Sequence, residues 1–339
     1  MAERVLTQRD LNRATLARQL LLRRTKLPVP RALERVAGLQ AQLGAAPYIG
    51  LWSRLAGFRR ESLERALLSG KAARGVLMRG TVHLVAASDY GLFASALDVA
   101  PPGWITPAAD RDAVRVTPAL RSFTAEPRTR TEVLDWLREE HAVDSGGTNG
   151  VWYALRLRAR IGYAPESSLW SAPIHNPRFV ALDHDEVDGE AARAELVRRY
   201  LAAFGPATRA EIAGWSGMKV GDFAHLLDGL AALRDDRGRQ LLDLPRAPRP
   251  AGDTPAPVRF LPKFDNVLLD RARVLPEAYR KLIVRKNADV QPTFTVDGYV
   301  AGIWRVERGR VVTEAFAPFP LAAKRELADE AERLQAWLG

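Results

Sequence analysis

A pair of glutamines separated by one residue, Gln40-Ala41-Gln42, is the part of this sequence whose residue types and spacing most suggest chemistry. On a helix continued from Leu33, Gln40 lies about 20° from that leucine around the axis and faces inward. If the helix ends near Ala41, the two side chains can converge as positions i and i+2 do in extended chain. Two amides would then hold one water molecule. The alternative is that Gln40 bonds a loop carbonyl while Gln42 is solvated.

A second group of polar side chains follows in Arg79-Gly80-Thr81-Val82-His83-Leu84, which reads as a strand. Its period of two places Arg79, Thr81 and His83 on one face, where a phosphate or a deoxyribose could bind. We therefore expect these three residues, and Arg54 in addition, to bind DNA. The alternative for His83 is a histidine satisfied by a nearby carbonyl.

Other kinds of site are excluded by what the sequence lacks. It contains no cysteine, so disulfides, thiolate zinc sites and cysteine nucleophiles are impossible. His175 and His184 have no partner at metal-ligand spacing, and neither a glycine-rich phosphate loop nor a G-x-S-x-G elbow occurs. We expect no metal and no cofactor. Four tryptophans in apolar surroundings are expected in the core: Trp152, Trp170, Trp215 and Trp304.

The charge distribution indicates a polyanionic partner. The chain has 50 Lys plus Arg, 40 Asp plus Glu and a net charge of +10. Residues 1–100 hold 16 of the basic and 7 of the acidic side chains. Phosphate contacts release condensed counterions, so a basic segment of this kind favours nucleic acid. The alternative is a composition bias, since 43 of the basic residues are Arg. No apolar run approaches the ~18 residues that a membrane span needs, so we expect a soluble cytoplasmic protein.

The elements that must position these residues follow from capping and periodicity. Thr7-Gln8-Arg9-Asp10 resembles a capping box and predicts a helix from Gln8. A second helix is predicted from Pro30 toward Gln40, a third after Pro47 and a fourth over 61–68. The period then changes to two over 75–86, which predicts strands. Short helices followed by strands favour a winged helix-turn-helix.

An internal repeat predicts two further modules of this kind. The pattern T-R-x-E-apolar-x-x-W occurs at 129–136 and again at 208–215, and each Thr can cap a helix. Helices are expected over 150–158 and 220–233, with strands within 160–181 and over 240–244. The predicted domains are a first module at 1–100, a linker at 101–120, and modules at 121–187 and 188–285.

The remaining chain is predicted to form a stiff loop, a small sheet and a closing helix. Five prolines mark 245–257 as a loop inside the third module. Residues 292–306 alternate around Asp297-Gly298, a strong hairpin signal, and Arg308-Gly309 turns the chain again. An amphipathic helix is expected over 321–338. Together with the hairpin it forms the C-terminal part, 286–339.

Four segments in this order, "GLQAQLGAAPYIGLWSRL", "LMRGTVHLV", "LPKFDNVLLD" and "VDGYVAGIWRV", resemble the winged-helix DNA glycosylases of the AlkZ/YcaQ type. The resemblance extends over essentially the whole chain. It implies an α+β fold of three tandem winged-helix modules in a concave arrangement. The family's catalytic element is Gln-apolar-Gln or Gln-apolar-Asp, and Gln40-Ala41-Gln42 matches the first form. That form is associated with resistance to genotoxic alkylating natural products and interstrand crosslinks.

The resemblance implies a monofunctional glycosylase in which Gln40 and Gln42 are catalytic. Its expected partner is duplex DNA with N7- or N3-alkylated purines, and we expect a monomer associated with the nucleoid. An alkylated purine is a cationic leaving group that needs no strong acid, so neutral amides suffice to place water and stabilise the sugar cation. We expect either the 297–298 hairpin or the loop near His175 to probe the duplex. The alternatives are a non-catalytic winged-helix transcription regulator and a structural chromatin binder.

Overall fold

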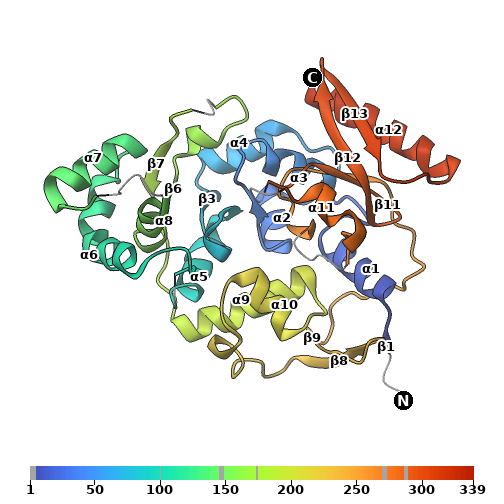
Figure 1. The fold of residues 1–339 in the computed structure, drawn as a ribbon, viewed down its shortest axis with the longest axis horizontal. Helices are drawn as coiled ribbons and strands as arrows, with labels where there is room; N and C mark the ends of the chain where they lie inside the picture. The colour runs from blue at the N-terminus through green and yellow to red at the C-terminus, as the bar shows by residue number, and fades with distance from the viewer. Residues whose placement is uncertain (1–4, 100, 145–148, 173–174, 269–272, 286–288) are drawn as a thin grey trace.

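The computed structural model describes residues 5–99, 101–144, 149–172, 175–268, 273–285 and 289–339. Within these ranges the chain forms an α+β fold in which helices surround sheets of three, four and six strands. Figure 1 shows the N-terminal helices (blue) between a green helical group, a yellow group that carries β8 and β9, and the orange and red C-terminal sheet. In the described part of the chain, no helix is both long and apolar enough to cross a membrane.

The predicted N-terminal helices are present, but one is shorter than expected. Helix α1 (Gln8–Arg18) begins at the Thr7–Asp10 capping box, as predicted. It is followed by α2 (Val29–Arg35), α3 (Ala46–Arg54) and α4 (Arg60–Leu68). The expected extension of α2 toward Gln40 is wrong, because Ala37 and Gly38 have φ values of 56° and 80°. A Cβ on Gly38 would stand 2.7 Å from Val85, so the turn that ends the helix requires glycine.

A six-stranded sheet positions the glutamine pair. Its order is β2-β4-β3-β6-β7-β5. The strands are β2 (Leu39–Gln40), β3 (Ala72–Val76), β4 (Val82–Ala86), β5 (Arg128–Thr129), β6 (Ile161–Tyr163) and β7 (Arg178–Ala181). The alternation over 75–86 is therefore a hairpin of β3 and β4 closed by a 3-10 turn at Met78–Gly80. The sheet joins the predicted first and second modules, since β3 pairs with β6.

Helix α5 (Ala87–Ala96) follows the first hairpin. The green group in Figure 1 comes next and contains α6 (Pro107–Phe123), α7 (Arg130–His141) and α8 (Asn149–Arg158). The segment predicted as a linker, 101–120, is wrong from Pro107 onward, because Thr106 caps α6 there. Thr129 and Glu132 form the capping box of α7, which confirms that helix start.

The yellow group holds the second copy of the repeat. It comprises α9 (Gly189–Phe204), α10 (Arg209–Ser216), β8 (Ala231–Asp235) and β9 (Gln240–Asp243). The capping box of Thr208 and Glu211 confirms the start of α10, but α9 was not predicted. The helix expected over 220–233 is wrong: it is a 3-10 turn at Val220–Asp222 followed by turns and β8, with Gly229 at a φ of 75°. Strand β1 (Val5–Leu6) lies parallel to β8 and ties the N-terminal segment to this group.

The predicted hairpin and closing helix of the C-terminal part are present, but a strand from the predicted third module joins their sheet. Strands β10 (Arg259–Leu261), β11 (Thr293–Val296), β12 (Tyr299–Glu307) and β13 (Arg310–Ala315) form an antiparallel sheet in that order. Asp297 and Gly298 turn between β11 and β12, and α12 (Leu321–Leu338) closes the chain. Short helical turns lie at Asn266–Leu268, Glu277–Tyr279 and Arg280–Ile283 (α11). No helix or strand occurs over 245–257, where the loop was predicted.

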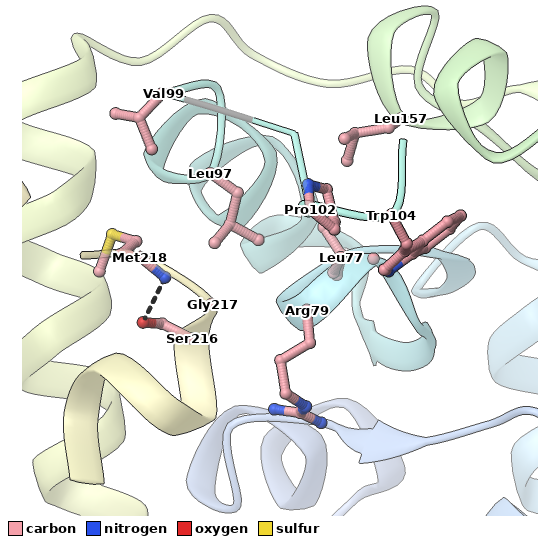
Figure 2. Close-up of a pocket in the computed structure, with 11 residues that line it drawn as sticks. Leu77, Arg79, Leu97, Val99, Pro102, Trp104, Leu157, Ser216, Gly217 and Met218 are labelled. Carbon is pink, nitrogen blue, oxygen red and sulfur yellow. Dashed lines mark hydrogen bonds between the residues drawn. The ribbon is translucent and has the colours of Figure 1, made fainter. Parts of the chain in front are cut away.

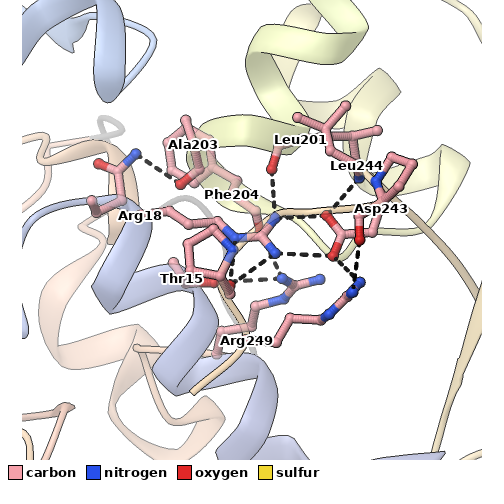
Figure 3. A network of polar contacts seen from close by, with 12 residues as sticks. Thr15, Arg18, Leu201, Ala203, Phe204, Asp243, Leu244 and Arg249 are labelled. Atoms are coloured by element: carbon pink, nitrogen blue, oxygen red, sulfur yellow. Dashed lines mark hydrogen bonds and ion pairs between the residues drawn. The ribbon is translucent and has the colours of Figure 1, made fainter. Parts of the chain in front are cut away.

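Buried side chains hold these groups together. Trp152, Trp215 and Trp304 are core residues as expected, and Trp170 is half-buried against Tyr48 and Trp337. A polar network links α1 to the yellow group: both carboxylate oxygens of Asp243 accept from the Arg18 guanidinium, at 2.7 and 2.9 Å (Figure 3). Both side chains are fully buried.

Candidate functional site

The backbone of the glutamine pair is extended, at the edge of the six-stranded sheet. Gln40 lies opposite His83 in the β2–β4 pair, and the Ala41 N–H donates to the carbonyl of Val82 at 2.7 Å. Asn266 fixes the strand from the other side: its Oδ1 accepts from the Gln40 N–H at 3.1 Å, and its Nδ2 donates to the Gly38 carbonyl at 2.9 Å. The spacing i and i+2 therefore occurs in extended chain rather than on a helix.

Each glutamine amide is oriented by one donor. Gln40 is 8% exposed, and its Oε1 accepts from Nη2 of Arg79 at 3.4 Å. Gln42 is half-buried, and its Oε1 accepts from the Val82 N–H at 3.0 Å. Since both donors are N–H groups, the oxygen of each amide is identified by its partner. Each oxygen keeps a second lone pair that can accept a hydrogen bond from water.

Arg79 is placed inside the site rather than on a strand face. It occupies the 3-10 turn between β3 and β4 with a φ of 58°, and its Nη1 donates to the Trp215 carbonyl. Burial lowers the pKa of Arg79 to about 10, so the guanidinium is still charged at neutral pH. The prediction that Arg79, Thr81 and His83 share one face of one strand is wrong, because the turn intervenes. Arg79 instead orients Gln40.

His83 and Thr81 have structural hydrogen bonds. His83 is fully buried, and its Nδ1 lies 3.0 Å from the Thr81 carbonyl, which can only accept. Burial and the nearby Arg79 lower the pKa of His83 to about 3, so the ring is neutral. Among the described residues nothing bonds its Nε2. The half-buried Thr81 donates its hydroxyl to Met78 and closes the turn. The burial of His83 speaks against direct contact with DNA.

The guanidinium of Arg54 is fully buried. Nη1 and Nη2 donate to the two carboxylate oxygens of Asp265, each at 2.8 Å, and Nη1 also donates to the Gly50 carbonyl. A paired and enclosed arginine is unavailable to phosphate. The burial and pairing of Arg54 therefore speak against the expected phosphate contact, and the residue joins α3 to the segment that carries Asn266.

Two residues of the site were missed by sequence reasoning. Asn266 lies in the segment "LPKFDNVLLD", where a polar Asp-Asn pair between apolar runs was the available signal. Arg74 is buried on β3, and its Nε donates to the Ala41 carbonyl at 3.0 Å. Its guanidinium also lies 3.9 Å from the centre of the Tyr163 ring. Nothing in the local pattern around Arg74 indicates either contact.

An apolar pocket of about 220 Å³ adjoins the Arg79 turn. Figure 2 shows Arg79 extending from it toward the N-terminal ribbon (pale blue), with Trp104 and Pro102 on one side. Trp104 is 50% exposed, which is unusual for a large aromatic side chain beside a pocket. The other apolar lining residues are Leu77, Leu97, Val99, Leu157 and Met218.

The hairpin at 297–298 is not free to probe a duplex. Asp297 pairs with Arg9 at 2.8 Å and with the buried Arg13, and the Gly298 carbonyl accepts from Nδ2 of Asn12 at 2.8 Å. A Cβ on Gly298 would lie 2.6 Å from three side-chain atoms of α1, so the tip is packed against that helix. His175 is exposed, and its loop stays a prediction.

Comparison with known proteins shows the family to which the chain belongs. The model of the family described as "DNA glycosylase AlkZ-like" matches residues 33–337. The "Interstrand DNA cross-link repair glycosylase" of Streptomyces sahachiroi is 27% identical over 334 residues, which cover 89% of this chain and 88% of that protein. The structure of Streptomyces sahachiroi DNA glycosylase AlkZ has the same fold, with a TM-score of 0.81 and 21% identity over 98% of each chain. The chain therefore belongs to the AlkZ-like DNA glycosylases, enzymes that hydrolyse N-glycosyl bonds in DNA.

Proposed function

We propose that this enzyme hydrolyses the N-glycosidic bond of cationic N7- or N3-alkylated purines in duplex DNA, interstrand crosslinks included, and that Gln40 and Gln42 are its catalytic residues. The observation that carries the proposal is the pair of amides at i and i+2, each with its oxygen held by a fixed N–H donor. The name of the Streptomyces sahachiroi relative supports crosslinks as substrates.

Neutral amides suit this reaction because the leaving group is already activated. A purine alkylated at N7 or N3 leaves without prior protonation, so the enzyme has to place a water and stabilise an oxocarbenium-like sugar. The second lone pairs of the two Oε1 atoms accept from that water and face developing positive charge. Glutamine holds no proton at neutral pH, and His83 beside it is neutral and buried. Normal bases, whose leaving groups are anionic, then react too slowly to be removed.

The pocket at the Arg79 turn supports bulky lesions as substrates. Its walls are apolar, and the guanidinium of Arg79 is turned to Gln40 and Trp215 rather than into the pocket. An alkyl substituent on the purine gains free energy by leaving water for such a surface. The substituent therefore lies here, against Trp104, while the sugar faces the glutamines.

The finer architecture in this proposal is three tandem winged-helix modules in a concave arrangement. Helices α7 and α10 begin at equivalent threonines, and antiparallel strand pairs, β6–β7 and β8–β9, follow each of them. The boundaries 1–100 and 188–285 are retained for the first and third modules, and the second begins at Pro107 with α6, so that it spans 107–187. The enzyme acts as a monomer on the nucleoid, in the cytoplasm.

The enzyme and the alternative, a non-catalytic winged-helix regulator, differ in one product. A duplex with a single N7-methylguanine is incubated with the protein, and abasic sites are detected by alkaline strand cleavage. We expect cleavage at the lesion and none in the matched undamaged duplex. Binding of the damaged duplex without abasic sites would instead establish the regulator.

A further inference from the structure

A second pocket, of about 420 Å³, lies away from the glutamines and is lined by donors without any carboxylate. It is formed by the first turn of α7, by one side of α8, by Tyr163 and by residues 176–179. Its lining includes the side-chain donors of Arg130, Thr131, Asn149, Arg156 and Asn176. A pocket with several donors and no acid is complementary to an anion.

Arg156 gives this pocket a buried and uncompensated positive charge. The residue is 1% exposed, and within the described part of the chain no acid pairs with it. Its Nε donates to the Ile161 carbonyl at 3.4 Å, while its Nη2 is buried without a partner. The rings of Trp152, Tyr153, Tyr163 and Phe179 surround its guanidinium at 4.7–5.8 Å. Aromatic faces offset part of the charge, but they leave the N–H donor unsatisfied.

The N-terminus of α7, a helix of 12 residues, adds to the positive potential of the pocket. Arg130 and Thr131 are its first two residues. The first N–H groups of a helix lack intrahelical partners and carry partial positive charge. The carboxylate of Glu132, on the first turn of α7, is engaged with the Thr129 N–H.

We propose that this pocket binds a phosphate group, either a backbone phosphodiester of the DNA substrate or the phosphate of a free nucleotide. The pocket is coupled to the glutamines through one ring, because Arg156 and Arg74 both contact Tyr163, and Arg74 donates to the Ala41 carbonyl. A bound backbone phosphate would fix the DNA strand relative to this ring. For a backbone phosphate, the inference rests on the proposed function, because the DNA must then lie on the same face as Gln40 and Gln42.

The test uses the full chain and undamaged duplex, so that it does not depend on excision. Arg130→Gln removes a half-buried charge at the pocket, and Asn149→Asp places a carboxylate at its exposed edge. Arg138→Gln is the matched control, because Arg138 lies on α7, is 60% exposed and pairs with Asp135. Affinity is measured over a range of salt concentrations. Calorimetric titrations with inorganic phosphate and with deoxyadenosine 5′-monophosphate test the free forms.

For a backbone phosphate we expect Arg130→Gln and Asn149→Asp to weaken duplex binding by roughly threefold to tenfold, and Arg130→Gln to lower the log–log salt slope by about 1. Arg138→Gln should leave both quantities unchanged. Saturable heat with phosphate or the nucleotide that is lost in Arg130→Gln identifies the free form instead. The proposal is overturned if Arg130→Gln changes neither the salt slope nor either titration. If Arg130→Gln lowers the salt slope of duplex binding but the wild-type protein makes no abasic sites, the phosphate site is supported and the proposed glycosylase activity is contradicted.

Discussion

At the scale of single residues, the site depends on which donor holds each amide. The sequence identifies Gln40-Ala41-Gln42 as the candidate because spacing is a local property. The donors are not local: Arg79 and the Val82 N–H come from 39 and 40 residues away along the chain. Arg54 shows the same limitation. The composition of its segment and its position suggest a DNA contact, but its partner Asp265 is 211 residues away along the chain. Composition cannot distinguish a paired arginine from one that is free for DNA.

Arg79→Lys tests whether the guanidinium orients Gln40. One ammonium cannot reproduce the two directions in which Arg79 donates, to Gln40 and to Trp215. We expect single-turnover excision to fall by roughly threefold to thirtyfold, with duplex affinity changed less than twofold. If the excision rate is unchanged and the salt slope of DNA binding is lower, Arg79 contacts a phosphate and does not orient Gln40.

His83 predicts a pH dependence of stability. The pKa of the ring is about 3 in the folded protein and about 6.5 in the unfolded chain, so only the unfolded chain takes up this proton as the pH falls from 6.5 to 3. The free energy of unfolding contributed by this residue therefore decreases with falling pH in that window. Between pH 7 and pH 5, the loss in the wild type should exceed the loss in His83→Gln by about 2 kcal/mol.

Denaturant unfolding of both proteins at the two pH values measures this difference. Burial raises the pKa of Asp89 to about 6, so this residue contributes more to the free energy of unfolding as the pH falls. Asp89 is present in both proteins, so its contribution cancels in the difference between them. Equal losses in wild type and variant would show that His83 is not the buried neutral histidine described above.

At the scale of elements, local signals predicted starts and turns better than ends. The capping boxes at Thr7, Thr129 and Thr208 mark real helix starts, and Asp297-Gly298 forms the expected hairpin. These signals are complete within four residues. The end of α2 and the two-residue strand β2 depend on pairing with β4 and on Asn266, which lies far along the chain. The apolar run after Val220 fits a helix or a strand, and pairing with β1 and β9 selects the strand there.

Asn266→Asp tests how the distant segment holds β2. The carboxylate loses the donor to the Gly38 carbonyl and places a charge in a fully buried position. The free energy of unfolding should fall by at least the roughly 1–3 kcal/mol of one unpaired buried carbonyl. Excision should fall by roughly tenfold or more under conditions where the variant is still folded, because the glutamines shift with β2. Wild-type excision in a destabilised variant would show that Asn266 contributes to folding alone.

At the scale of the whole molecule, part of the N-terminal excess of basic residues forms ion pairs inside the protein. Arg13, Arg18 and Arg54 are fully buried, and their carboxylate partners, Asp297, Asp243 and Asp265, all lie beyond residue 240. The basic segment is thus partly complementary to acids of the same chain. The inference from charge to nucleic acid was correct about the partner, as the family shows, but these three arginines are not its basis.

Asp243→Asn tests the ion pair between Arg18 and Asp243. The substitution removes the charge that compensates Arg18, and it weakens the contact with Arg249 at 2.8 Å (Figure 3). Loss of one partner of a buried pair should lower the free energy of unfolding by about 3–5 kcal/mol. Asp135→Asn, in an exposed pair with Arg138, should change it by less than about 1 kcal/mol. Equal midpoints of denaturant unfolding for both variants would contradict this description.

The catalytic role of Gln40 and Gln42 is tested by measuring excision and DNA binding separately in the full-length enzyme. In single-turnover assays on a duplex with N7-methylguanine, Gln40→Ala and Gln42→Ala should each slow excision by roughly tenfold to several hundredfold, with duplex affinity nearly unchanged. The double variant should lose less than the product of the two factors, since both amides act on one water and one sugar cation. Gln335→Ala, an exposed amide on α12, is the control and should excise at the wild-type rate. If both single variants also excise at the wild-type rate from a duplex that they bind normally, the glutamines are not catalytic.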